Sequence, residues 1–115
     1  MTRHTAMILG GARMPIGRYG GPLSHIRTDH LLGLALNAAV ERGDVEEIAA
    51  GCVNQAHEGL GDIARWAALG AGFPDHVPAY TVNRFCASSL TTTIQLAQPS
   101  HLGNWGSGSA PASSP

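Results

Sequence analysis

Charged residues are scarce in this chain. Asp, Glu, Lys and Arg make up 13% of its 115 residues, which is about half of their usual share in globular proteins. The net charge is −1 and the basic residues are dispersed, so the charge pattern does not indicate nucleic acid or an anionic membrane as a partner. Low charge together with 15 glycines indicates close packing of backbones, or surfaces that further protein covers.

Cysteines and long apolar runs are also few. The two cysteines, Cys52 and Cys86, do not form a disulfide framework. The apolar stretch Ala6–Leu9 is too short for the core of a signal peptide. The longest apolar-rich region, Leu31–Val40, falls short of the ~20 residues that a membrane helix needs. We therefore expect a protein of a soluble, reducing compartment, the cytoplasm.

Apolar runs and glycines predict strands and helices in alternation. Short strands are expected at Thr5–Leu9, Glu47–Val53 and Val77–Val82. A loop rich in glycine and proline, Arg13–Leu23, follows the first strand, and Asn54–Gly61 forms another loop. Strands that alternate with helices are typical of a layered α/β domain.

Helices are predicted after each strand. The first is capped by Thr28 or Asp29 and stopped by Gly43, and the second ends at Gly72 and Pro74. The third begins with small residues after the third strand. One face of the second helix carries small apolar residues at helical spacing: Ile63, Ala64, Ala67, Ala68 and Ala71.

The pattern breaks near the end of the sequence. Thr91, Thr92 and Thr93 are β-branched and have poor helix propensity. The last part, Gln98–Pro115, is dominated by Gly, Ser, Pro and Ala, which bury too little to offset the entropy of ordering. We expect a domain over residues 1–97 and a disordered tail over residues 98–115.

Cys86 is the candidate catalytic residue. It follows the β-branched end of a strand, Tyr80–Val82, and precedes small residues that open a helix. Unpaired N–H groups at a helix N-terminus favour the thiolate, and such settings lower a cysteine pKa from about 8.5 to roughly 3.5–7.5. Because the thiolate is the nucleophile, covalent catalysis is one interpretation. A buried cysteine that acts as a small hydrophobe is the other.

Other motifs carry less chemistry. Cys52 lies within a predicted strand and is interpreted as a core residue. Cys52, His57 and Cys86 lack the close pair of ligands typical of zinc sites, so no metal is expected. The glycines at 10–11 and 17–21 match no phosphate-binding motif and are interpreted as turns.

Three blocks of residues occur together and in order. They are Arg13–Gly21, Ala50–Ala56 and Thr81–Leu90, and with them the sequence from about residue 5 to residue 93 resembles the N-terminal part of a thiolase. This family contains acetyl-CoA acetyltransferases and 3-ketoacyl-CoA thiolases. Two departures are small: Met14 stands where the family commonly has Thr, and His57 where it commonly has Gly. A condensing enzyme of the fatty-acid synthase type shares the nucleophile but is a weaker match.

The resemblance implies a fold, a reaction and a setting. The fold is a partial thiolase N-terminal domain with three layers, α-β-α. Cys86 would attack the thioester of an acyl-CoA and take the acyl group, with no metal or bound cofactor beyond coenzyme A thioesters as substrates. Small residues at Ala87, Ser88 and Ser89 would let a thioester carbonyl approach backbone N–H groups, which could stabilise an oxyanion. Fatty-acid metabolism and a homo-oligomer are also implied.

Thiolases use further segments that this sequence does not contain. These are an Asn-Glu-Ala-Phe type segment, a Gly-His-Pro segment, a Cys-x-Gly segment and the coenzyme A-binding loop region. We therefore expect this isolated chain to be inactive, with turnover only if a companion chain supplies the remainder. The alternative interpretation is a non-catalytic remnant that acts at most as an association module.

Overall fold

The computed structural model describes residues 5–40, 45–57 and 60–102. A short 3-10 helix, Pro22–His25, precedes helix α1, Thr28–Ala39. Strand β1 is Ile48–Gly51, helix α2 is Ile63–Gly70, strand β2 is Ala79–Val82 and helix α3 is Ser88–Leu102. No helix within these ranges combines the length and the apolarity needed to cross a membrane.

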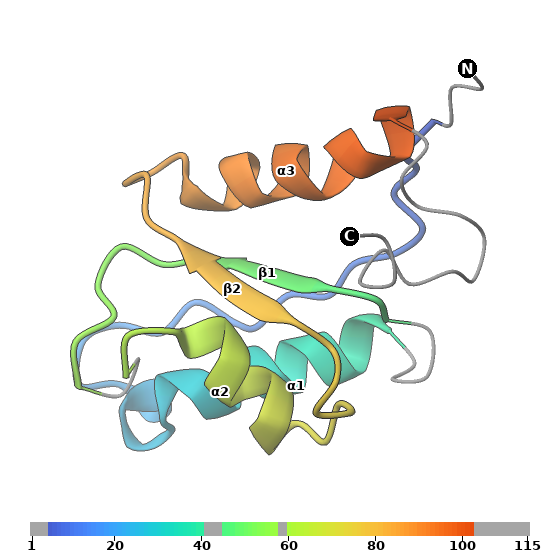
Figure 1. The fold of residues 1–115 in the computed structure, drawn as a ribbon. Helices are drawn as coiled ribbons and strands as arrows, with labels where there is room; N and C mark the ends of the chain where they lie inside the picture. The colour runs from blue at the N-terminus through green and yellow to red at the C-terminus, as the bar shows by residue number, and fades with distance from the viewer. Residues whose placement is uncertain (1–4, 41–44, 58–59, 103–115) are drawn as a thin grey trace.

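The two strands form a parallel pair between helices. Ile48 pairs with Ala79 and Gly51 with Val82. Helices α1 and α2 cover one face of this sheet and α3 covers the other, which gives three layers (Figure 1). Parallel strands need a crossover connection, and α2 lies within it between β1 and β2. The turn after β2 therefore leads directly to the opposite layer, where α3 begins.

Small side chains build the core between the sheet and α2. The predicted inner face of α2 is confirmed: Ala64, Ala67 and Ala68 are at most 1% exposed. Around them lies a buried cluster of larger side chains, namely Ile48, Ile63, Phe73 and Val77. Helix α1 packs closely against the end of α2, because a Cβ on Gly33 would lie only 3.3 Å from the Ala71 Cβ atom.

Helix α2 begins with a cap that reaches the neighbouring strand. The Asp62 carboxylate accepts a hydrogen bond from the Arg65 backbone N–H at 3.4 Å. The Thr81 hydroxyl on β2 donates to the same carboxylate oxygen at 2.6 Å and accepts from the Ala64 N–H at 3.1 Å. Two N–H groups of the first turn are thereby satisfied, and α2 is fixed against β2.

The predicted ends of α1 were wrong by a few residues. The helix begins at Thr28 and its cap residue is Arg27, which has an extended backbone and makes no side-chain capping bond. The Asp29 carboxylate pairs with the Arg27 guanidinium at 3.1 Å, and Asp29 lies inside the first turn, so it is not the cap residue. The helix ends at Ala39 because Val40 is already extended. The predicted stop, Gly43, lies outside the described residues.

The first predicted strand, Thr5–Leu9, is not a strand in the structure. Met7, Ile8 and Leu9 are 75%, 88% and 92% exposed. A strand obtains its backbone hydrogen bonds from a neighbour. In the described part of the chain β1 and β2 pair only with each other, so an apolar run alone did not specify a strand.

Helix α3 continues through the residues that were expected to interrupt it. The hydroxyls of Thr92 and Thr93 each donate to the Ser89 carbonyl at 2.9 Å, so they are satisfied within the helix. The helix runs past Gln98 to Leu102. The expectation of a disordered tail was therefore wrong for residues 98–102, and residues 103–115 lie outside the described part.

The predicted loop before α2 contains two non-glycine residues with an unfavourable backbone, His57 and Leu60, the latter with a φ of 48°. His57 has a φ of 57°, in the left-handed region that glycine adopts at no steric cost. The departure from glycine at this position therefore has a physical consequence, a backbone cost of about 1–2 kcal/mol.

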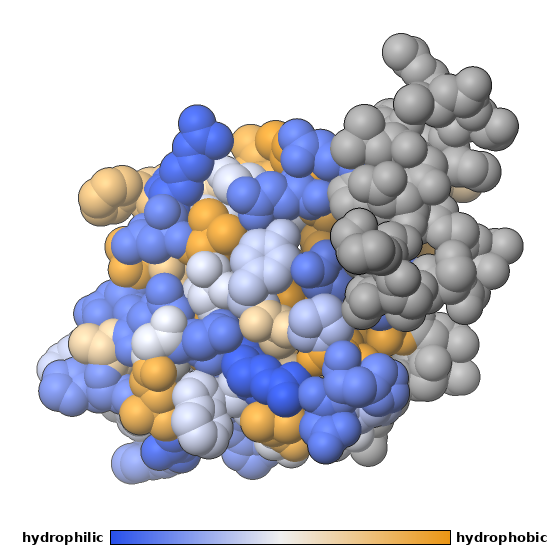
Figure 2. Space-filling model, viewed as in Figure 1, coloured by the Kyte–Doolittle hydropathy of each residue, from blue (hydrophilic) through white to orange (hydrophobic). Residues whose placement is uncertain are grey.

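Apolar side chains remain exposed on helix α3. On α3, Leu90 is 63% and Ile94 48% exposed. Figure 2 shows apolar residues in separate spots between polar ones on the face seen in Figure 1. The expectation that some surface is left for further protein to cover rests on such side chains.

Candidate functional site

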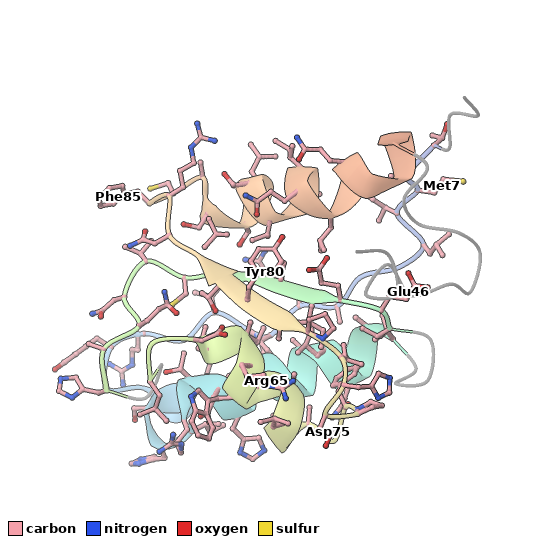
Figure 3. The ribbon with its side chains drawn as sticks, in the orientation of Figure 1. Met7, Glu46, Arg65, Asp75, Tyr80 and Phe85 are labelled. Atoms are coloured by element: carbon pink, nitrogen blue, oxygen red, sulfur yellow. The ribbon has the colours of Figure 1, made fainter. Side chains whose placement is uncertain are left out.

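Cys86 lies on the turn that joins β2 to α3, as predicted. Its side chain is exposed, and it precedes the first residue of α3, Ser88, by two positions. The residue before it, Phe85, is 74% exposed and has a φ of 50°. Figure 3 shows the Phe85 side chain pointing away from the sheet at the tip of this turn. The interpretation of Cys86 as a buried hydrophobe does not fit this position.

Two polar side chains, Asn83 and Ser88, hold the turn by hydrogen bonds to backbone groups. The Asn83 side-chain oxygen accepts from the Phe85 N–H at 3.1 Å, and its amide nitrogen donates to the Val53 carbonyl at 2.9 Å. The Ser88 hydroxyl accepts from the Arg84 N–H at 2.8 Å and donates to the Phe85 carbonyl at 2.6 Å. Sequence reasoning missed both roles, although an Asn two residues before a turn amide is a known turn signal.

Gly51 lets β1 approach the beginning of α3. A Cβ atom on Gly51 would lie 2.6 Å from the Ser88 carbonyl carbon and 2.8 Å from the Ser88 Cβ atom, and would also meet the Ser89 backbone nitrogen. Real Cβ atoms do not come so near to backbone atoms. Only glycine therefore permits this packing, which fixes the end of the turn against the sheet.

The backbone N–H groups after Cys86 are engaged within the turn. The Ala87 N–H donates to the Arg84 carbonyl and the Ser88 N–H to the Phe85 carbonyl, both at 3.1 Å. We expected these groups to be open to a thioester oxygen. The tight turn uses them first, because a turn of this kind is closed by such backbone bonds.

Cys52 packs against the core, as predicted, but just beyond the strand. It is partly buried, and its thiol donates to the Asn54 carbonyl at 3.3 Å. Its backbone N–H donates to the Val82 carbonyl at 3.0 Å and so extends the ladder past Gly51. It also lines a pocket of about 440 Å³ that α1, β1 and α3 border. Among the described residues no three His, Cys, Asp or Glu side chains could hold a metal ion together.

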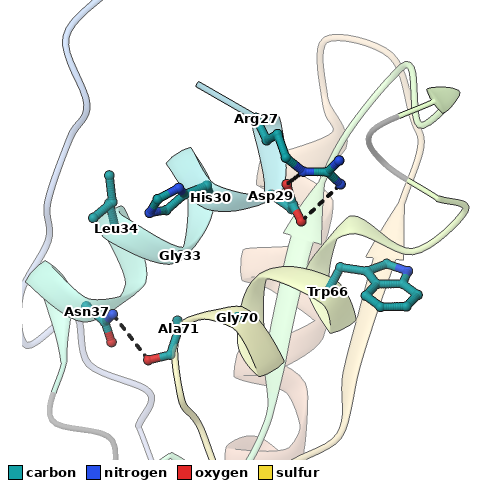
Figure 4. Close-up of a pocket in the computed structure, with 9 residues that line it drawn as sticks. All are labelled: Arg27, Asp29, His30, Gly33, Leu34, Asn37, Trp66, Gly70 and Ala71. Atoms are coloured by element: carbon teal, nitrogen blue, oxygen red, sulfur yellow. Dashed lines mark hydrogen bonds and ion pairs between the residues drawn. The ribbon is translucent and has the colours of Figure 1, made fainter. Parts of the chain in front are cut away.

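A further pocket, of about 310 Å³, lies between α1 and α2 (Figure 4). Two pairs of its polar groups bind one another: Arg27 with Asp29, and the Asn37 side chain with the Ala71 carbonyl at 3.3 Å. Burial opposes ionisation of Asp29, but the hydrogen bond and charge of Arg27 and backbone N–H donors outweigh it and lower the pKa of the carboxyl. The pocket lies on the layer opposite α3, so it is separate from Cys86.

Comparison with known protein families identifies the family of the chain. The model of the thiolase N-terminal domain matches residues 6–106. The chain belongs to the thiolase family. The match extends past Thr93, where we expected the resemblance to end, and helix α3 also continues past that residue.

Several thiolases are similar in sequence. The β-ketoadipyl-CoA thiolase of Pseudomonas aeruginosa is 45% identical over 89 residues, which are 72% of this chain and 22% of that protein. The acetyl-CoA acetyltransferase of Syntrophomonas wolfei is 35% identical over 104 residues, 85% of this chain and 26% of the relative. The chain thus spans about a quarter of the length of the curated relatives that it matches.

Solved thiolase structures share the fold. The acetyl-CoA acetyltransferase of Syntrophomonas wolfei superposes with a TM-score of 0.80 at 30% identity, covering 90% of this chain and 27% of that one. The enzyme of Bacillus anthracis gives 0.73 at 34% identity, covering 88% and 27%. The prediction of a partial α/β domain of the thiolase type is confirmed, and the names of these relatives support an acyltransferase by resemblance.

Proposed function

We propose that Cys86 is the acyl-accepting nucleophile of a thiolase-type acyltransferase. The observation that carries this proposal is an exposed thiol on a strand-to-helix turn, in a chain whose family is that of the thiolases. The partial positive charge at a helix N-terminus favours negative charge on the residues in front of it. A thiolate is also a soft nucleophile and a good leaving group, as thioester exchange requires.

The proposed first half-reaction begins at the Cys86 sulfur. The Cys86 sulfur, once its proton has passed to solvent, attacks the carbonyl carbon of an acyl-CoA thioester. A new sulfur–carbon bond forms, the bond to the coenzyme A sulfur breaks, and coenzyme A leaves as a thiolate that takes up a proton. The acyl group then remains on Cys86 until a second acyl-CoA, deprotonated at its α-carbon, or a thiol removes it.

The relatives support the substrate class. They are named β-ketoadipyl-CoA thiolase and acetyl-CoA acetyltransferase, so both names refer to coenzyme A thioesters. On the family resemblance we extend the proposal to acyl-CoA substrates of the kind used in fatty-acid metabolism, to a cytoplasmic location and to self-association of the whole protein. No bound cofactor is part of the proposed reaction.

The test measures the first half-reaction alone. The full chain is incubated with acetyl-CoA, and intact mass with peptide mapping shows where an acetyl group is bound. We expect one acetyl group on Cys86, none in Cys86→Ala, and the same adduct in the matched control Cys52→Ala. Acetylation that maps to Cys52, or that is equal in Cys86→Ala, would show that Cys86 is not the acceptor.

A further inference from the structure

Ser88 is buried although the turn in front of it is exposed. Ser88 is 4% exposed, whereas Phe85 and Cys86 beside it are exposed. Its oxygen accepts from the Arg84 N–H at 2.8 Å and its proton goes to the Phe85 carbonyl at 2.6 Å. One buried hydroxyl therefore bonds to the backbone on both sides of the Arg84–Phe85 peptide segment.

Phe85 shows why such a bond is needed. Its φ of 50° lies in the left-handed region, which costs a residue with a side chain about 1–2 kcal/mol. The side chain is 74% exposed, so burial does not offset that cost. Hydrogen bonds do: the Phe85 N–H is bound by Asn83 and its carbonyl by Ser88. A strained residue persists only where its surroundings hold it.

The strained residue directly precedes the candidate nucleophile. The orientation of Cys86 relative to Phe85 depends on two backbone torsions, ψ of Phe85 and φ of Cys86. The Phe85 carbonyl, which Ser88 holds, belongs to the peptide group between these two torsions. Ser88 in turn cannot shift toward β1, because Gly51 brings that strand into contact with its backbone. The packing against β1 thus holds Ser88 in place, and the Ser88 hydroxyl in turn holds the backbone of Arg84 and Phe85.

We propose that Ser88 is a positioning residue for Cys86. Its hydroxyl keeps Phe85 in the left-handed conformation and thereby holds the Cys86 thiol in front of the first turn of α3. It acts through the backbone, because its proton already goes to the Phe85 carbonyl, its oxygen accepts from the Arg84 N–H, and the residue is only 4% exposed. The importance of Ser88 for acyl transfer rests on the proposed function, whereas its positioning of Cys86 does not.

Alkylation of the thiols by iodoacetamide tests this without any acyl-CoA. Rate constants for Cys86 and Cys52 are measured in the same sample of the full chain by peptide mapping. In Ser88→Ala the turn relaxes and the thiol loses the positive end of α3, so we expect the rate at Cys86 to fall about fivefold. The rate at Cys52 and the rates in the matched control Ser89→Ala should stay within about twofold of the wild type.

A rescue variant separates positioning from packing. Glycine adopts a positive φ at no steric cost, so Phe85→Gly should hold the turn without the hydroxyl. We expect Phe85→Gly, Ser88→Ala to recover most of the Cys86 rate relative to Phe85→Gly alone. A Cys86 rate that is unchanged in Ser88→Ala, or a loss that glycine at position 85 does not reduce, overturns the proposal.

Hydrogen exchange of the wild-type chain keeps the proposal testable if Ser88→Ala does not fold. Arg84 is exposed, and the partner of its N–H is the Ser88 hydroxyl. We expect this amide to exchange at least about tenfold more slowly than an unstructured amide. Exchange at the unstructured rate would show that the hydroxyl does not hold the turn.

Discussion

Substitution of Gly51 by alanine should be the most damaging single-methyl change near the Cys86 turn. The added Cβ would lie 2.6 Å and 2.8 Å from two atoms of Ser88 and would also meet the Ser89 backbone nitrogen. Since two of these atoms belong to the backbone at the beginning of α3, a change of rotamer cannot relieve the contact. Either β1 or the first turn of α3 must move.

The size of the effect follows from two opposing contributions. Overpacking of a close-packed site costs about 1–3 kcal/mol, and backbone displacement places Gly51→Ala at the upper end. Replacing glycine by alanine lowers the conformational entropy of the unfolded chain, which stabilises the folded state by about 0.4–1 kcal/mol. We expect the free energy of unfolding to fall by about 2 kcal/mol. With urea m-values of about 1–3 kcal/mol/M for small proteins, the midpoint should fall by about 1 M.

Urea unfolding followed by circular dichroism measures this change. The matched control is Gly70→Ala at the end of α2, where an added Cβ would meet nothing within 4 Å. That variant should be more stable than the wild type by about 0.4–1 kcal/mol, since only the unfolded state is affected. If Gly51→Ala is as stable as Gly70→Ala, the close approach of β1 to α3 is not a feature of the protein in solution.

Two further changes test the scaffold. Thr81→Val removes the hydroxyl that bonds to Asp62 and to the N–H of fully buried Ala64, so it should lower the free energy of unfolding by about 1–3 kcal/mol. Thr93→Val, at an exposed position of α3, is its matched control and should change stability by less than about 0.5 kcal/mol; equal losses in both variants would contradict the capping role. Burial raises the pKa of Glu47, so its protonated form favours the folded state, and this contribution is lost as the pH rises through the raised pKa. Glu47→Gln should therefore be more stable than the wild type at neutral pH, and the difference in urea midpoints should close as the wild-type carboxyl becomes protonated in acid. A difference that does not depend on pH would refute burial as the cause.

Elements whose pattern is local were predictable from the sequence. The alanines of α2 recur at helical spacing, and they form its buried face. The β-branched end of β2 followed by small residues placed Cys86 on a strand-to-helix turn, where the structure has it. The three thiolase-like blocks predicted the family. The role of Cys86 as nucleophile stays a prediction.

Features that depend on particular hydrogen-bond partners, near or distant, could not be predicted in this way. Thr5–Leu9 has the composition of a strand, but pairing requires a neighbour that composition does not reveal. Thr92 and Thr93 have low helix propensity, yet their hydroxyls bond to the Ser89 carbonyl within α3. The Ser88 bonds occur together with a positive φ angle at Phe85, which no local pattern of residues specifies.

The alanine face of α2 has a consequence for how this sequence can diverge. Ala64, Ala67 and Ala68 are almost completely covered, and no space remains for a larger side chain without moving a layer. Trp66 and Leu69, on the same helix, are 46% and 42% exposed. Among descendants of this chain that still fold, accepted substitutions in α2 should therefore collect at the outward positions, while positions 64, 67 and 68 accept only alanine or glycine.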